Sequence, residues 1–192
     1  MIPKRIAAKF FATDSNADVD FDAFIGVFHE FVREKSVEGV LIDVADYGHV
    51  PEGPGVVLIG HDVDYSIDLN EGRAGLLTVG KRLEGGTVAE HLDDTVRKCL
   101  LAVKAVQANG SSGTSFSTAG VKVQVVDRLA APNSDDGFAA CKAEFEALAT
   151  RVFGDGASVE RADADEARKP LAATITGASA QDLDTLLARL ER

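Results

Sequence analysis

Several stretches of the chain are rich in apolar and β-branched residues, and in some of them apolar and polar positions alternate, as is typical of β-strands. These stretches are residues 6–12, 40–50, 56–69, 75–82, 121–125 and 171–175, with a shorter one around Val159. The Glu71-Gly72 pair predicts a tight turn that joins the third and fourth stretches in a hairpin. The pattern therefore predicts seven strands, of which residues 56–69 form one long strand.

Apolar residues spaced three and four positions apart predict four helices, because that spacing places them on one helix face. Asp20, Thr87, Ser134 and Ser179 each precede such a segment and are expected to be the N-caps. Thr87 is followed three positions later by Glu, which completes a capping box, and Asn109-Gly110 predicts the end of that helix.

The predicted order is βαβββα, then a segment rich in Gly and Ser, then βαββα. This order indicates an α+β fold, a two-layer sandwich in which helices cover one face of a mostly antiparallel sheet. It also predicts two ferredoxin-like (split β-α-β) halves, residues 1–108 and 121–192, joined by a linker over residues 109–120. A parallel doubly wound sheet is disfavoured, because the hairpin connections are too short for crossovers.

Charge and cysteine content narrow the range of partners and locations. The net charge of −11 disfavours binding to nucleic acid or to anionic membrane surfaces. Lys9 interrupts the apolar N-terminal run, so neither a signal peptide nor a membrane span is expected there. Cys99 and Cys141 fall on apolar helix faces and are expected to be buried, unpaired thiols. These features predict a cytoplasmic protein.

Three motifs come near a metal or nucleotide signature without completing one. Asp or Asn at every second position of residues 14–20 resembles the start of an EF-hand loop, but Val19 and Ile25 replace its required Gly and Glu. The glycine-rich segments 53–60 and 110–115 lack the strand-to-helix context or the Lys that bind nucleotide phosphates. We therefore expect no metal and no cofactor.

One candidate site follows from strand register. Odd positions of residues 56–69 place His61 and Tyr65 on one face, and counting back from the hairpin turn places Arg82 opposite His61. If residues 40–50 pair antiparallel with this strand, Ala45 lies near His61. One exposed face would then gather Asp43, Tyr47, His49, His61, Tyr65, Thr78 and Arg82, all but Thr78 being candidate ligand-binding residues.

Three interpretations of that face remain open. It is an ordinary polar sheet surface, a homodimer interface that includes apolar Val57, Ile59, Val63 and Ile67, or a pocket in which His and Arg bind a small anionic ligand.

The leading functional hypothesis is a non-catalytic binding, regulatory or assembly protein that acts through the exposed face, by self-association or with a protein partner. The alternative is a small cytoplasmic hydrolase or isomerase that uses His61 or His49 as general base on an anionic substrate, helped by Tyr65 and Arg82. No motif in the sequence decides whether the chain is an enzyme.

Overall fold

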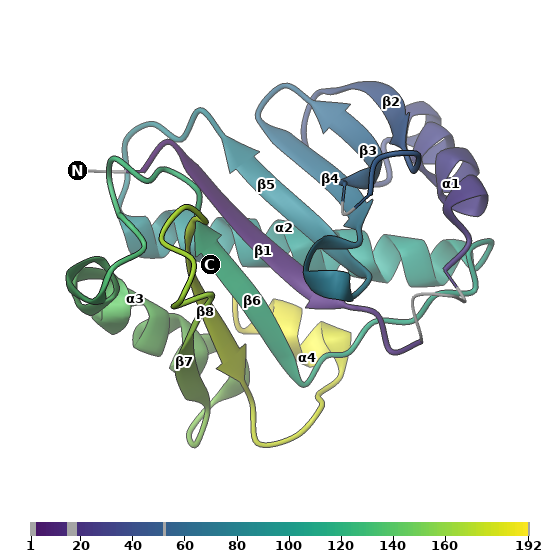
Figure 1. Ribbon diagram of the computed structural model, residues 1–192. Coiled ribbons are helices and arrows are strands. Elements are labelled where there is room, and N and C mark those ends of the chain that lie inside the picture. The colour runs from purple at the N-terminus through teal and green to yellow at the C-terminus, as the bar shows by residue number, and fades with distance from the viewer. Residues whose placement is uncertain (1–2, 15–18, 52, 192) are drawn as a thin grey trace.

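One antiparallel sheet of eight strands organises the part of the chain that the computed structural model describes, residues 3–14, 19–51 and 53–191. Its order is β2-β3-β4-β5-β1-β6-β8-β7 (Figure 1). The strands are β1 (Arg5–Phe11), β2 (Leu41–Tyr47), β3 (Gly55–Gly60), β4 (Val63–Asp68), β5 (Gly75–Lys81), β6 (Gly120–Val125), β7 (Ser158–Ala162) and β8 (Leu171–Thr176). The predicted α+β class and antiparallel sheet are confirmed.

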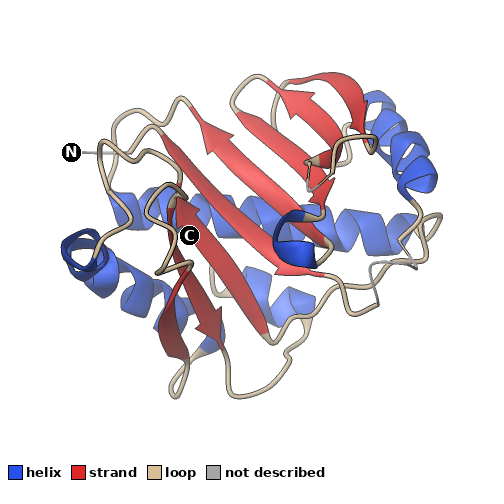
Figure 2. Cartoon of the chain, in the orientation of Figure 1, coloured by secondary structure: helices blue, strands red, loops and turns tan. Residues whose placement is uncertain are grey.

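The α-helices lie on one side of this sheet. They are α1 (Phe21–Glu34), α2 (Val88–Asn109), α3 (Asp135–Phe153) and α4 (Leu183–Ala188). Helix α2 contacts β1 and β5, α1 contacts β2 and β3, and α3 contacts β7 and β8. The 3-10 turn η2 (Asn70–Gly72) lies in front of the sheet on the opposite side, as Figure 2 shows. We call this second side the open face.

Side-chain caps fix where the first three helices begin. Asp20 accepts from the Ala23 amide, Thr87 and Glu90 form both hydrogen bonds of the capping box, and Ser134 accepts from the Gly137 amide at 3.1 Å. These three predicted caps are confirmed. The short α4 begins instead after Asp182, which accepts from two amides of the first turn, so the expected cap at Ser179 is wrong. Residues 16 and 18 of the calcium-like motif lie outside the described residues.

The predicted long strand over residues 56–69 is wrong, because the chain reverses at His61-Asp62. Gly60 and Val63 flank this two-residue turn, and β3 and β4 form a hairpin in which Leu58 pairs with Tyr65. Even positions of β3 therefore share a face with odd positions of β4. A sequence count that runs straight through the turn therefore assigns the residues of β4 to the wrong face.

The two predicted strand registers have different outcomes. Between β4 and β5, Val63 pairs with Gly80, and the Lys81 amide donates to the Asp62 carbonyl at 2.7 Å. The predicted register of that hairpin is confirmed. Between β2 and β3, Tyr47 pairs with Gly55 instead of Ile59, four positions earlier, so that predicted register is wrong. The connection is longer than PEGPG alone, and the pairing shifts again at a bulge near Leu41.

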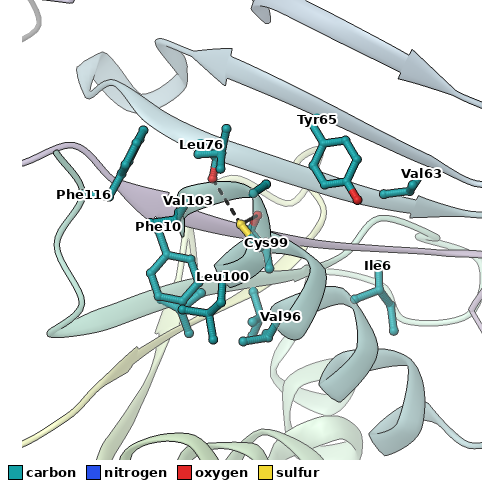
Figure 3. Close-up of a cluster of buried hydrophobic side chains, with 14 of the residues drawn as sticks. Ile6, Phe10, Val63, Tyr65, Leu76, Val96, Cys99, Leu100, Val103 and Phe116 are labelled. Carbon is teal, nitrogen blue, oxygen red and sulfur yellow. Dashed lines mark hydrogen bonds between the residues drawn. The ribbon is translucent and has the colours of Figure 1, made fainter. Parts of the chain in front are cut away.

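The hydrophobic core fills the space between the sheet and the helices. Phe10 of β1, Leu76 of β5 and Cys99 and Val103 of α2 are all fully buried and lie together in Figure 3. Tyr65 of β4 points into the same cluster, and its hydroxyl donates to the Glu38 carbonyl at 2.9 Å. The core therefore runs continuously behind the central strands.

The segment 109–120 lies against β1. Gly110 ends α2 in a left-handed conformation, and Phe116, only 5% exposed, forms an isolated bridge with Ala12. The Ser117 amide donates to the Phe11 carbonyl at 2.8 Å. Beyond it, β6 pairs with β1, so strands from both predicted halves belong to one sheet.

Cysteine labelling tests the helix packing. Burial raises the pKa of Cys99 to about 12, and its thiol lies 3.4 Å from the Ala8 carbonyl, whereas Cys141 is half-buried. The thiolate is the reactive form, so we expect Cys99 to react with a thiol reagent at pH 8 at least about a thousandfold more slowly than a free cysteine. Cys141 should react faster, and denaturation should make the two equal. Rapid labelling of Cys99 in the Cys141→Ser variant under native conditions would contradict this packing.

Candidate functional site

Two lysines lie side by side in the middle of the open face. Lys9 of β1 and Lys122 of β6 are direct cross-strand partners, and Leu77 and Thr174 continue the same row on the neighbouring strands. The two lysines are only 3% and 2% exposed. Like charges directly opposite each other destabilise a sheet, so each ammonium requires its own compensation.

Lys9 is compensated by the segment that leads through η2. Its ammonium donates to the Arg73 carbonyl at 2.9 Å and to the Asn70 carbonyl at 3.1 Å, and it forms an ion pair with Asp68. Asp68 Oδ1 contacts the Lys9 ammonium, and Oδ2 accepts from the side-chain amide of Asn70 at 3.1 Å. Lys9 therefore ties the η2 segment to the central strand.

Lys122 connects two loops across the open face. It forms ion pairs with Glu71 of η2, at 2.7 Å, and with Asp163, which follows β7. Asp163 is paired a second time, with Lys169 before β8. We call Lys9, Lys122, Asp68, Glu71 and Asp163 the paired-lysine site.

A glycine makes room for this arrangement. Gly75 of β5 pairs with Phe11, and a Cβ atom added there would lie 2.6 Å from Cε of Lys9 and 2.7 Å from the Phe10 carbonyl. The Phe10 carbonyl belongs to the paired backbone and cannot move aside for such an atom, and the Lys9 side chain is held in place by its three partners. Gly75 is therefore required for Lys9 to reach Asp68.

A cavity of about 260 Å³ opens above the paired-lysine site. Leu77 and Gln124 contribute to it from the sheet, and Pro170 from the loop before β8. That loop is held in place by Asn133, whose amide donates to the carbonyls of Asp163 and Glu166 at 2.8 and 3.1 Å. The cavity walls are therefore fixed by buried polar contacts.

The carboxyl groups of the site experience different environments. Burial raises the pKa of Asp68, although Lys9 and Asn70 oppose the shift. Burial also acts to raise the pKa of Asp163, but the hydrogen bonds and charges of Lys122 and Lys169 outweigh it, and that pKa is lowered. A buried carboxyl group with a shifted pKa beside a cavity is a common property of functional sites.

The geometry favours binding over nucleophilic chemistry. The three N–H groups of the Lys9 ammonium each have an acceptor. A lysine nucleophile would instead need a neutral amine with a free lone pair. Within residues 3–14, 19–51 and 53–191, no group of three His, Cys, Asp or Glu side chains is arranged to hold a metal ion. The site presents charged and amide groups whose positions are already fixed.

The structure separates the residues that the sequence placed on one exposed face. Tyr65 and Thr78 face the helices and are 1% and 0% exposed, so their predicted exposure is wrong. Val63 and Ile67, expected to contribute to an exposed interface, are core residues for the same reason. The turn at His61-Asp62 is the cause, because it directs the odd positions of β4 towards the helices.

The other predicted site residues are exposed but do not converge on a cavity. His61 lies in the β3–β4 turn, 57% exposed, with Nδ1 2.7 Å from Asp62 Oδ1, and the Arg82 guanidinium donates to its carbonyl. Asp43 and Tyr47 lie on β2, and His49 lies in the loop that follows. The cavities at the paired-lysine site, at Arg73, at Lys35 and at Asp94 have no histidine among their lining residues.

Two of the four apolar residues expected on an exposed face, both on β3, do lie on the open face, and two residues of β5 join them. Val57 and Ile59 of β3 and Leu77 and Val79 of β5 are partly exposed there, separated by Asp64 and Ser66 of β4. We call Val57, Ile59, Leu77 and Val79 the open-face patch. Leu77 also lines the cavity, so the patch and the paired-lysine site are continuous.

Sequence reasoning missed the paired-lysine site, although a signal was present. Lys9 interrupts an otherwise apolar strand, whereas Lys122 alternates regularly with Val121 and Val123 and gives no such signal. A lysine inside a central strand must be paired. The sequence does not name the partners, which lie 41 to 64 positions away.

No protein-family model, no curated protein and no solved structure matches this chain. In the part of the chain that the structure describes, no helix combines the length and apolar character needed to cross a membrane.

The Lys9–Asp68 pair can be tested by a double-mutant cycle. Lys9→Met leaves Asp68 buried without its cation, so we expect a loss of about 3–5 kcal/mol in the free energy of unfolding. In the double variant with Asp68→Asn the loss should be smaller than the sum of the two single losses, by about 1–3 kcal/mol. Urea unfolding of the four proteins measures this, and additive losses would show that the two residues do not interact.

The raised pKa of Asp68 predicts a pH dependence. The folded protein holds this proton more tightly than the unfolded chain, in which the pKa is about 3.9. The resulting stabilisation is fully present below that value and is lost as pH rises through the raised pKa. The free energy of unfolding of the natural protein, relative to Asp68→Asn, should therefore fall as the pH rises above about 4 in urea titrations. A difference that grows with pH would mean that attraction to Lys9 outweighs burial.

Proposed function

We propose that this chain is a non-catalytic binding protein that self-associates through the open face of its sheet. The observation that supports this most directly is the position of the helices, all on one side, which leaves the open-face patch partly exposed. A sheet face with apolar side chains is stabilised when a second layer covers it. The second layer in this proposal is another copy of the chain.

Local charge supports a second copy as the partner. The open face pairs its charges internally, with Lys81 bound to Asp64 at 2.7 Å beside the patch and the paired-lysine site compensated within itself. Two copies with a net charge of −11 each can therefore meet over β4, β5 and β1, where these carboxylates are paired, and away from Asp43, which lies beside Ile59 at the β2 edge of this face.

We also propose that the two halves of the sheet are split β-α-β units of ferredoxin-like type. The order β6-β8-β7 around α3 supports this for the second half, with β1 beside β6 where a fourth strand would lie. In the first half, α1 connects β1 to β2, and β3, β4 and β5 lie between these two strands in the sheet.

The unpaired Cys99 and Cys141 fit a reducing compartment, so the cytoplasm remains the proposed location.

The alternative, an enzyme with His61 or His49 as general base, stays a prediction. The His61–Asp62 contact resembles a base oriented by a carboxylate, but both side chains are more than half exposed. General-base catalysis benefits from a site that excludes water, which an exposed turn does not supply. The small anionic ligand expected from the sequence likewise remains a proposal.

Self-association through the patch is tested by Val79→Asp. The substitution places a carboxylate in an apolar contact where it loses hydration without gaining a partner, so we expect the dimer to dissociate to monomer. Native mass spectrometry and light scattering at about 50 µM would measure the change, and far-UV circular dichroism would confirm that the fold is intact.

Leu129→Asp is the matched control. Leu129 is 91% exposed and belongs to the loop after β6, so this variant should keep the oligomeric state of the natural protein. A monomeric natural protein, or a dimer that persists in Val79→Asp, would contradict the proposal.

A further inference from the structure

Exposed large apolar side chains of the described residues concentrate at one edge of the sheet. Val40, Ile42, Tyr47 and Val50 are 66%, 59%, 41% and 40% exposed, and all four lie on β2 or directly beside it. Among the described residues only Leu129 joins them as an exposed large hydrophobic residue. Surface leucines and valines are normally scattered, so this concentration indicates a contact surface.

Strand β2 is bonded on one side only. It is the first strand in the sheet order, and β3 is the described strand that pairs with it. Its other side presents backbone N–H and C=O groups to an incoming strand. Proteins usually protect such an edge with Lys or Pro, and neither occurs within β2.

The charge around this edge is of one sign. Residues 36–72 contain no Lys or Arg and eight carboxylates: Glu38, Asp43, Asp46, Glu52, Asp62, Asp64, Asp68 and Glu71. Cations from other segments pair with four of these, Arg97 with Glu38, Lys81 with Asp64, Lys9 with Asp68 and Lys122 with Glu71. The two carboxylates on β2, Asp43 and Asp46, are not among the four that these cations pair with.

The two carboxylates on β2 itself bond to nearby backbone. Asp43 accepts from the Val44 amide and Asp46 from the Gly48 amide, both at 2.8 Å. Neither forms an ion pair with a Lys or Arg of the described residues, and both are exposed. The edge thus offers apolar side chains, backbone hydrogen bonds and two carboxylates without a cation.

We propose that the outer edge of β2 binds an extended segment of a partner protein that is rich in apolar residues and carries basic residues on both of its faces, added as a ninth strand, because Asp43 and Asp46 lie on opposite faces of β2. Main-chain hydrogen bonds would supply affinity and the carboxylates would select the basic residues. A second copy of the chain does not fit this edge, because pairing β2 with β2 brings Asp43 and Asp46 of two acidic molecules together. The inference is independent of the proposed function, which concerns the face of the sheet.

A labelled peptide of about nine residues, made of Val and Lys with a Lys on each face of the extended chain, is the probe. We expect it to bind the full chain in fluorescence anisotropy and to bind Asp43→Lys/Asp46→Lys at least about tenfold more weakly. Asp155→Lys, an exposed carboxylate before the opposite edge strand β7, is the control and should bind like the natural chain. A matched Val/Glu peptide should show the reverse preference and favour the doubly substituted chain.

Hydrogen exchange locates the bound peptide. Amides of residues 41–47 should gain protection in the complex, while those of β7 should not change. Absence of binding at 1 mM peptide would overturn the proposal, and so would binding that leaves these amides unprotected or is equally weakened by Asp155→Lys. A dimer of the natural chain that the double substitution dissociates would assign the edge to a second copy instead.

Discussion

The ammonium group of Lys9, buried in the central strand, is the constraint on which the open face depends. An uncompensated charge at that depth would destabilise the sheet, so the chain must bring oxygen atoms to it. It does so by folding residues 68–73 back over β1. The buried ammonium of Lys122 likewise needs oxygen partners, and it pairs with Asp163 on the other side. The loops that enclose the cavity are therefore positioned by charge.

The two faces of the sheet are stabilised by different kinds of interaction, apolar packing behind it and polar contacts in front. Behind it, apolar side chains from the sheet and the helices pack into a continuous core that is non-directional and tolerant of strand offsets. In front, ion pairs and hydrogen bonds fix individual atoms, as Gly75 illustrates by leaving space for one lysine stem.

Local chemistry was predictable from sequence, and long-range placement was not. The caps at Asp20, Thr87 and Ser134 and the β4–β5 register follow from neighbouring residues, and the structure has them as predicted. The reversal at His61-Asp62 was missed because apolar residues occupy the odd positions on both sides of it, at 57 and 59 and again at 63, 65 and 67, so that the two strands look like one. The partners of Lys9 and Lys122 come from distant loops, and no local pattern encodes them.

The position of β1 has a consequence for how the chain acquires its structure. Ile6 pairs with Gly80 on one side and with Val125 on the other. Strand β1 therefore cannot complete its pairing until β5 and β6, which follow much later in the chain, have been synthesised. Closing such long loops costs entropy before any contact is gained, and folding dominated by these pairings is slow. Until β6 arrives, the growing polypeptide exposes an unfinished hydrogen-bonding strand with Lys9 at its centre, which a ribosome-associated chaperone would have reason to shield.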